Sequence, residues 1–522
     1  MNIVDKIIEY ISPQTALKRE RARAATHMIR NFINSGYSES GASRRKKSLA
    51  GWNAVSKSPY EDIDLNLDLL RQRSRDLYMS APLAVSALKT NRTNIIGAGL
   101  KLKSRIDFEY LGLTKEEADE WERNAEREFE IWANSVFCDS TRLNNFYELQ
   151  QLALLSWLMN GDAFALIKYD KPTSYMPYGL RIHLIEADRV STPDNVIVNQ
   201  GIVKAANGNK ILNGIEIDNS GGVVAYYICN QYPNSTLLEF KKKWTRVEAF
   251  GERTGNPNIL HIMESERCEQ YRGVPYLAPV IESLKQITRY AEAELTAAVI
   301  TGFFTVFIKT DNNTSEIPIT SPIPDEEQLE LDESSYELGA GTVNVLRPGE
   351  DVVIADPKRP SSNFDSFVNA LAKYIGAALE IPYELLTKSF TASYSASRAA
   401  LLEAWKAFKM RRTWFANDFC QPIYEIWLAE AVARGRISAP GFFNDIAIRK
   451  AWCGTEWTGP SPGQIDPVKE VEAAIKRIEQ GLSTREKETT ELTGGDWDKN
   501  IIQIQRENEL LKRAMKGDEK SE

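Results

Sequence analysis

Several stretches of the chain repeat apolar side chains every three or four positions, the spacing of one face of a helix. The clearest stretch begins at Thr114, where Glu117 three residues later completes a capping-box pattern ahead of an apolar stripe that runs to Trp132. Similar patterns predict two helical stretches between about 63 and 97, separated by Ser80-Ala81-Pro82. Further helices are predicted around 146–159, 280–298, 364–379, 401–419, 468–479 and 500–515.

Between residues 180 and 264 the apolar period changes to two, which is typical of strands with one buried face. KILNGIEID and VVAYYICN flank the turn sequence NSGG (219–222) and predict a hairpin. Further along, FFTVFIK (303–309) is strand-like, and TVNVL (342–346) with DVVIAD (351–356) predicts a second strand pair. A compact β piece between two helices is therefore expected, and the fold class is α+β.

Two segments have no strong apolar period. Residues 12–60 are rich in Ser, Gly, Asn and Arg, and we expect them to be extended or loosely ordered. Pro382 lacks an N–H group and biases Ile381 away from helical angles, so the preceding helix must end there and a loop over 382–397 follows. Within TKSFTASYSAS (387–397) one side chain is charged, and it belongs to a lysine.

Composition limits the class of protein. Of 522 residues, 43% are hydrophobic and 26% charged, which is ordinary globular usage and excludes a largely disordered chain. The five cysteines are odd in number and contain no CxxC pair, which argues against a zinc ribbon or a secreted disulfide scaffold. The longest charge-free apolar stretch, Leu295 to Ile308, is shorter than the ~20 residues of a membrane-spanning helix, so no membrane partner is expected.

The formal net charge of −8 is unevenly distributed. Residues 1–60 contain eleven basic and four acidic side chains, whereas nine acids and no base lie between Lys309 and Arg347. The basic run is either a solvated tail or a functional basic arm. The acidic run is either a solvated loop or an acidic docking surface.

The sequence contains no recognisable catalytic apparatus. Its three histidines are His27, His183 and His261, and the last two lie in strand-like runs where a structural imidazole is the common finding. HExxH, DxDxDG and GxSxG motifs are missing, and GYSESGAS (36–43) has Ala42 where a phosphate-binding loop needs lysine. We therefore expect no enzyme, no catalytic residue, no metal site and no cofactor.

Four blocks of sequence together resemble the lambda family of tailed-phage portal proteins. They occur in the family's order and are spread over the chain from about residue 60 to about residue 515. The blocks are RSRDLYMSAPLAVSALKTNRTNIIGAGLKLKS (73–104), RGVPYLAPVI (272–281), EIPYELLTKSFTASYSASRAALLEAW (380–405) and WTGPSPGQIDPVKEVEAAIKRIEQGL (457–482).

The resemblance implies a homo-oligomeric ring, a dodecamer, at one vertex of the virion capsid. Double-stranded DNA would be packaged and ejected through it, and it would be assembled in the bacterial host cytoplasm. The implied partners are the large terminase subunit, the major capsid and scaffold proteins, and the neck or head-tail connector proteins. The family order divides the chain into a basic arm (1–59), wing (60–275), stem helix (276–300), clip (301–360), second stem helix (361–381), tunnel loop (382–397), long wing helix and connection (398–464), and crown (465–522).

Three groups of residues receive expected roles from this placement. The DNA-facing residues of the tunnel loop are expected to be Lys388, Ser389, Phe390, Thr391, Tyr394 and Arg398. The acidic residues of the clip, expected to dock a partner, are Asp325, Glu326, Glu327 and Glu330. Packing between subunits is expected at Leu284, Ile287 and Leu295 of the first stem helix, whose stripe can equally belong to the core of the chain itself.

A second hypothesis assigns the chain to another class. It is a soluble DNA-binding enzyme or regulator in which the basic residues 18–57 form the DNA-binding arm. The missing nucleotide and metal motifs, together with the negative balance outside residues 1–60, favour the portal hypothesis.

Overall fold

The structure is a computed structural model, and it describes residues 10, 12–33, 42–43, 46–194, 197–199, 202–233, 235, 241–302, 306–310, 350–354, 364–390, 393–464 and 466–518. Contacts divide the chain into two compact units, Met1–Ser58 and Pro59–Glu522. Each unit is described by itself.

The first unit contains a helix that the sequence pattern did not predict. α2 (Pro13–Ile33) occupies much of the segment expected to be extended, and a short 3-10 turn, η2 (Lys47–Leu49), follows. That expectation was wrong for α2 because its Ala, Arg, Lys and Glu residues favour a helix without an apolar stripe. Basic side chains are exposed along it, including Lys18 and Arg21.

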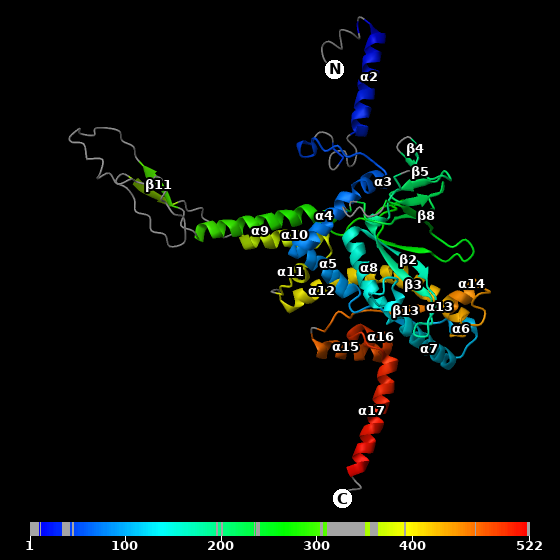
Figure 1. Cartoon of the computed structure of the whole chain (residues 1–522). Coiled ribbons are helices and arrows are strands. Elements are labelled where there is room, and N and C mark those ends of the chain that lie inside the picture. Colours follow the sequence, from blue (N-terminus) through cyan, green and yellow to red (C-terminus); the bar gives the residue numbers. More distant parts are fainter. Residues whose placement is uncertain are drawn as a thin grey trace, which may run out of the picture. The chain divides into compact units, whose positions relative to one another are not determined.

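The second unit combines helices with antiparallel sheets, in agreement with the predicted α+β class (Figure 1). Its first helices are α3 (Pro59–Asp62), α4 (Leu67–Ser80), α5 (Pro82–Ile95), α6 (Phe108–Leu111), α7 (Lys115–Ala133) and α8 (Phe146–Asn160). Later helices are α9 (Ile281–Gly302), α10 (Phe364–Ala378), α11 (Tyr383–Thr387), α12 (Tyr394–Phe415), α13 (Gln421–Ala433), α14 (Ile446–Trp452), α15 (Pro467–Glu479), α16 (Arg485–Thr493) and α17 (Trp497–Asp518). Short turns are η3 (Asp64–Asn66), η4 (Val136–Cys138), η5 (Ala187–Arg189), η6 (Ala278–Val280) and the π-helical η7 (Ala416–Cys420).

The strands form four sheets among the described residues. Their orders are β10-β2-β3, β4-β5-β6-β7-β8-β9, β1-β13 and β11-β12. The bounds are β1 (Lys101–Ser104), β2 (Asp162–Tyr169), β3 (Leu180–Glu186), β4 (Ile197–Asn199), β5 (Ile202–Lys204), β6 (Lys210–Leu212), β7 (Ile215–Ile217), β8 (Val223–Cys229), β9 (Trp244–Glu248), β10 (Ile259–Met263), β11 (Val306–Thr310), β12 (Glu350–Ile354) and β13 (Thr455–Thr458).

Two details of the sheets differ from the sequence expectation. The predicted hairpin exists as β7 and β8, but an extra turn at Asn213 and Gly214, both with positive φ, divides its first strand into β6 and β7. In the β piece after α9, β12 pairs antiparallel with β11, whereas the expected partner segment 342–346 lies outside the described residues.

The core of the second unit contains a cluster of aromatic rings from distant segments. Phe129 of α7 contacts Phe146 of α8 at 5.7 Å and Trp427 of α13 at 5.0 Å between ring centroids, both edge to face. All three side chains are fully buried. Capping boxes at Thr114 and Asn145 begin the two helices, so local signals agree with the packing that fixes them.

A π-helical turn precedes the proline in the long helical segment that runs from α12 into α13. α12 passes through η7 into α13, where Pro422 lies in the first turn, a position at which its missing N–H group is tolerated. The sequence expectation of a kink or restart at Pro422 is confirmed. The turn keeps Phe415 and Phe419 buried on the core side.

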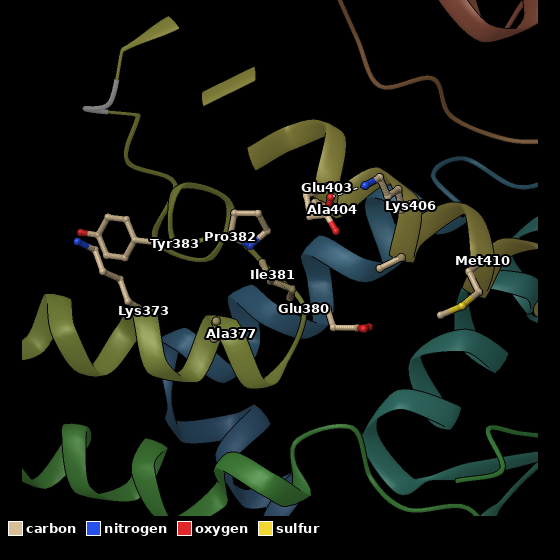
Figure 2. A pocket seen from close by; sticks show the side chains of 12 residues that line it. Lys373, Ala377, Glu380, Ile381, Pro382, Tyr383, Glu403, Ala404, Lys406 and Met410 are labelled. Carbon is tan, nitrogen blue, oxygen red and sulfur yellow. Dashed lines mark hydrogen bonds and ion pairs between the residues drawn. The ribbon is translucent and has the colours of Figure 1, made fainter. Parts of the chain in front are cut away.

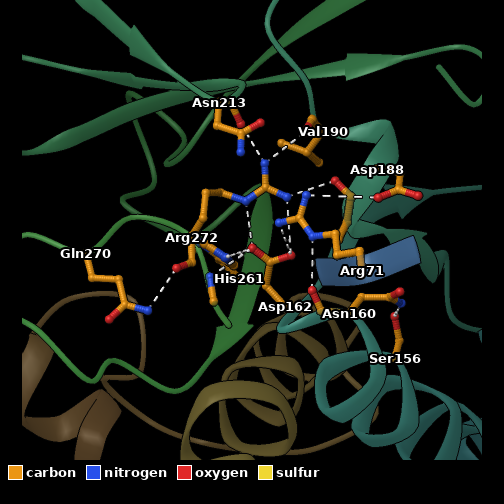
Figure 3. Close-up of polar contacts among 12 residues, drawn as sticks. Arg71, Ser156, Asn160, Asp162, Asp188, Val190, Asn213, His261, Gln270 and Arg272 are labelled. Carbon is orange, nitrogen blue, oxygen red and sulfur yellow. Dashed lines mark hydrogen bonds and ion pairs between the residues drawn. The ribbon is translucent and has the colours of Figure 1, made fainter. Parts of the chain in front are cut away.

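A buried ion cluster joins the helical part to the sheets (Figure 3). Asp162, the first residue of β2, accepts hydrogen bonds from Arg272 Nε at 2.6 Å and Nη2 at 3.2 Å, and Arg71 of α4 reaches it at 3.5 Å. Arg272 also donates to the carbonyls of Val190 and Asn213. Asp162 and Arg272 are fully buried, and Arg71 is 1% exposed.

The charged side chains of this cluster change the pKa values of one another. Burial by itself would raise the pKa of Asp162, but Arg272 and Arg71 outweigh it and hold that pKa well below its usual range. Burial and the charge of Arg272 lower the pKa of Arg71 to about 10. Asp162 thus pairs with both buried guanidinium groups, and Asp188 lies 4.0 Å from Arg71 as a second acidic neighbour.

Two glycines allow the backbone to pass close beside this cluster. Gly161 has a φ of +91°, and a Cβ atom there would collide with the carbonyl of Gly273. A Cβ atom at Gly273 would in turn collide with the backbone of Gly161. The close approach therefore brings Asp162 and Arg272, their sequence neighbours, within bonding distance.

Removing the carboxylate should destabilise the fold strongly. Asp162→Ala would remove the carboxylate that the buried Arg272 bonds and leave Arg71 with the more distant Asp188. We expect it to cost about 3–5 kcal/mol in the free energy of unfolding, seen as a lower urea midpoint. The control is Asp119→Asn, which breaks an exposed pair with Lys115 and should cost less than about 1 kcal/mol. Equal midpoints for the two variants would contradict the role given to the cluster.

Candidate functional site at the connection of α10, α11 and α12

α9 and α10 lie side by side although 61 residues separate them in the sequence (Figure 1). Tyr290 of α9 contacts Phe364 and Phe367 of α10 at 5.3 and 5.1 Å between ring centroids. β11 follows α9 and β12 precedes α10, so the two helices and the strand pair form one excursion of the chain.

The apolar stripe of α9 has two parts with different surroundings. Leu284 is 1% exposed and Ile287 7%, so their apolar surface is already used inside the chain. Leu295 is 67% exposed and Val299 51%. Of the three residues expected to pack between subunits, Leu295 has exposed apolar surface for such a contact. Leu284 and Ile287 pack within the chain, which is the alternative that the sequence left open.

The segment expected to be a loop after Pro382 contains a short helix. α11 begins at Tyr383, one residue after that proline, and Leu386 packs into the core. The loop prediction was wrong here because a proline that ends one helix also suits the start of the next. α10 and α11 are joined through Glu380 in a left-handed conformation and an Ile381 N–H bond to Gly376 O.

Lys388 lies at the end of α11, also in a left-handed conformation. Its Nζ donates to Thr90 Oγ1 of α5 at 2.7 Å, and partial burial lowers the pKa of Lys388. Ser389 is half-buried next to it, and Phe390 is 56% exposed. The lysine thus contacts its own chain in this structure, a contact that the sequence pattern could not reveal.

Several of the other predicted site residues lie outside the residues that the structure describes. Thr391 and the side chain of Tyr394 are not among the described parts, and Arg398 is half-buried in the second turn of α12. Asp325, Glu326, Glu327 and Glu330 of the acidic segment all lie outside the described residues. The structure therefore brings together Lys388, Ser389 and Phe390 but does not test the acidic group.

A pocket of about 500 Å³ lies between α10, α11 and α12 (Figure 2). Its lining combines apolar residues such as Ile381, Pro382 and Ala404 with charged residues of both signs. Its lining residues are Lys373, Gly376, Ala377, Glu380, Ile381, Pro382, Tyr383, Glu403, Ala404, Lys406, Ala407 and Met410. Glu403 and Lys406 pair at 2.5 Å on α12, and Lys373 Nζ lies 5.5 Å from the Tyr383 ring centroid.

Arg411, to which the sequence pattern gave no role, fixes the connection between α10 and α11. Arg411 of α12 is 4% exposed, bonds Glu380 Oε2 at 2.6 Å, and lies over the ring of Tyr276 at 5.1 Å. Tyr276 donates its hydroxyl hydrogen to the carbonyl of Leu379. One buried guanidinium group therefore joins the start of the α9 region to the α10–α11 junction.

In the described part of the chain, no group of three or more His, Cys, Asp or Glu side chains could hold a metal ion. No described helix is both long and apolar enough to cross a membrane. His183 and His261 lie in β3 and β10, as the sequence pattern predicted, and burial lowers the pKa of both.

Curated relatives of similar length match most of the chain. The portal protein of Escherichia phage N15 is 26% identical over 481 residues, covering 88% of this chain and 87% of the relative. Portal protein B of Escherichia phage lambda is also 26% identical, over 478 residues and with the same coverage. A probable portal protein of a Halomonas phage is 24% identical over 415 residues, 79% of this chain and 74% of the relative.

Two solved structures, one of a gene transfer agent particle and one of a phage portal protein, align with much of this chain. The neck of an empty gene transfer agent particle aligns over 81% of this chain and 92% of its own, with a TM-score of 0.44 and 13% identity. An HK97-family phage portal protein from Corynebacterium diphtheriae aligns over 70% and 92%, with a TM-score of 0.29 and 11% identity.

The sequence model described as "Phage portal protein, lambda family" matches residues 45–412, which is more than half of the chain and includes α9, α10 and α11 and most of α12. This chain belongs to the lambda family of phage portal proteins.

Proposed function

We propose that copies of this chain form a dodecameric ring at one vertex of the capsid, through which double-stranded DNA is packaged and later ejected. The observation that carries the proposal is the match of the family over residues 45–412. Within that range, the succession of α9, a strand pair, α10, α11 and α12 agrees with the family order of stem, clip, stem, tunnel segment and wing helix.

The charge of the chain suits a conduit for DNA. DNA presents about one negative charge per 1.7 Å of axis, and basic side chains that neutralise phosphates make adhesive, salt-dependent contacts. Twelve copies at −8 would carry about −96, so the bulk of the ring repels the duplex from its surfaces. Lys388 and Arg398 then supply a few cations at the proposed tunnel segment, beside the exposed ring of Phe390.

The proposed partners follow from this placement. The acidic residues between 311 and 337 would form a negative collar that attracts a basic surface of the large terminase subunit or of a neck protein. Major capsid and scaffold proteins would surround the ring during assembly in the host cytoplasm. The ring itself would hydrolyse nothing, and the terminase would supply the energy for packaging.

The exposed part of α9 should contribute to assembly. Leu295→Asp places a charge on a 67% exposed apolar site, and we expect a lower yield of rings with unchanged helical content by circular dichroism. Leu143→Asp, at a loop residue that is 76% exposed, is the matched control and should leave the yield unchanged. The yield is measured by size-exclusion chromatography, and an equal yield for both variants would remove α9 from the interface.

Substitutions of Lys388 should change DNA packaging or retention more than they change ring assembly. Lys388→Ala removes one weak attraction per subunit and should reduce packaging completeness or DNA retention modestly, and Lys388→Glu should reduce it further, with rings intact in both. Thr90→Val removes the internal hydrogen bond without changing the charge and serves as the control. If Thr90→Val reproduces the lysine effect, the residue acts within its own chain. If the lysine variants package normally while variants of Lys18 and Arg21 do not, DNA contacts the basic arm instead.

The acidic segment should control a salt-dependent docking step. Changing Asp325, Glu326, Glu327 and Glu330 to their amides should weaken binding of the terminase subunit at low salt and flatten its dependence on ionic strength. Amides at the exposed Glu116 and Glu120 of α7 are the control. Unchanged affinity across ionic strengths, measured by biolayer interferometry, would place the docking surface elsewhere.

A further inference from the structure

Another pocket, of about 880 Å³, lies at the six-stranded sheet that contains β4, β5 and β8 in Figure 1. Its walls come from the segment before β4, from β5 and β8, and from β9 with the residues just before it. Of its ten lining residues five are basic and one is acidic, in a chain whose formal net charge is −8. The charged residues of the lining are Lys204, Lys241, Lys242, Lys243, Arg246 and Asp194.

Arg246 is already neutralised by a buried carboxylate. Its Nε donates to Glu216 Oε2 at 2.7 Å and its Nη2 to Oε1 at 3.1 Å, and Glu216 is fully buried. Tyr227 donates its hydroxyl hydrogen to the same carboxylate at 3.1 Å. Burial by itself would raise the pKa of Glu216, but the hydrogen bonds that it accepts, first of all from Arg246, outweigh burial and lower that pKa to about 2. The polar groups of Arg246 and Tyr227 are therefore held in place and in use.

The lysines of the pocket, in contrast, have no acidic partner. All four are exposed, and no carboxylate in the described part of the chain pairs with any of their ammonium groups. Asn230 holds the backbone of the lysine run, because its Nδ2 donates to Lys241 O at 3.3 Å and its Oδ1 accepts from the Lys243 N–H at 3.0 Å. Like charges on a fixed segment repel one another, and a bound anion relieves that repulsion. The arrangement favours a ligand with several negative charges.

The aromatic residues of the pocket indicate which polyanion fits. Trp244 is half-buried, and its indole N–H donates to Ser191 Oγ at 3.0 Å. The ring of Tyr227 is half-buried as well. Single-stranded nucleic acids need open rings on which bases stack, and these two rings are largely covered. Duplex DNA would extend beyond the pocket over a chain of net negative charge, whereas the carboxylates of a short acidic peptide can lie within the pocket.

We propose that this pocket binds an acidic, extended segment of another protein through the ammonium groups of its four lysines. Lysine presents a compact charge on a flexible stem, so it pairs with carboxylates without requiring one fixed geometry. In an extended peptide every second side chain points the same way at a spacing of about 7 Å, so several carboxylates can reach the pocket together. The pocket lies within one copy of the chain, so the proposal does not depend on the proposed ring.

A labelled peptide of alternating glutamate and serine tests the pocket in the full-length protein by fluorescence anisotropy. Lys241→Gln combined with Lys243→Gln should weaken binding of this peptide several-fold at low salt, and the difference should shrink as salt screens the charges. The control combines Lys168→Gln with Lys171→Gln, which removes two exposed lysines at the end of β2 and changes the net charge equally. Equal affinities of the two double variants would overturn the proposal, as would a parental chain that does not bind the peptide.

Asp194 provides a test of the opposite sign. Asp194→Asn removes the acidic charge of the lining, and it should tighten binding of the same peptide several-fold because a repulsion is lost. Asp119→Asn, on the exposed surface of α7, makes the same chemical change outside the pocket and should leave the affinity unchanged. If the two variants bind the peptide equally, the peptide does not lie in this pocket.

Nucleic acid is the competing ligand and needs its own measurement. We expect the acidic peptide to bind more tightly than an oligothymidine with the same number of negative charges, and more tightly than duplex DNA of matched charge. Equal or tighter binding of either nucleic acid, lost in the Lys241→Gln and Lys243→Gln double variant, would make the pocket a nucleic-acid site and overturn the proposal. Rings that assemble and package DNA without binding the peptide would count against the pocket alone.

Discussion

One buried carboxylate, that of Asp162, determines how the helical part and the sheets of the second unit meet. Asp162 is the first residue of β2, and its partners Arg71 and Arg272 come from α4 and from the segment that leads into α9. Since an unpaired charge in this site would be costly, the three segments have little freedom to separate. Just after Arg272, the Tyr276 N–H bonds Leu158 O of α8, which places the approach to α9 relative to the core.

The same constraint extends to the connection proposed to face DNA. Tyr276 lies under Arg411, and Arg411 pairs with Glu380 at the end of α10. A line of contacts therefore leads from the buried ion cluster to the α10–α11 junction, through groups that are mostly buried. Lys388 lies beyond that junction, held to α5 by one hydrogen bond to Thr90. The proposed tunnel segment thus has a fixed base and a more exposed end.

The sequence predicted those features that depend on local signals. The capping box at Thr114 and the period of two in residues 180–264 correctly indicated α7 and the β-rich block. The α2 helix was missed because an exposed helix carries no apolar stripe, and α11 because Pro382 can end a helix or precede one. Asn213-Gly214 is a hairpin signal, but the alternating apolar pattern around it predicted a single strand.

The candidate site could be predicted from the sequence only in part. Its position after α10 was readable, because Pro382 and the hydroxyl-rich segment that follows stand out in the sequence. The contacts that shape it were not readable: Arg411 reaches Glu380 across 31 residues, and Lys388 reaches Thr90 across 298. Likewise, the burial of Leu284 and the exposure of Leu295 on one stripe depend on where neighbouring elements end.

The pairing of β1 with β13 has a consequence for the timing of synthesis. Lys101 pairs with Thr458, so the strand formed early in the chain finds its partner 357 residues later. At translation rates of about 5–20 residues per second, roughly 20–70 s separate the emergence of the two strands from the ribosome. During that interval Trp457, which contacts Phe129 and Phe146, is also missing from the aromatic core. A nascent chain cannot complete this core early, so truncated products would reach the assembly pathway without it.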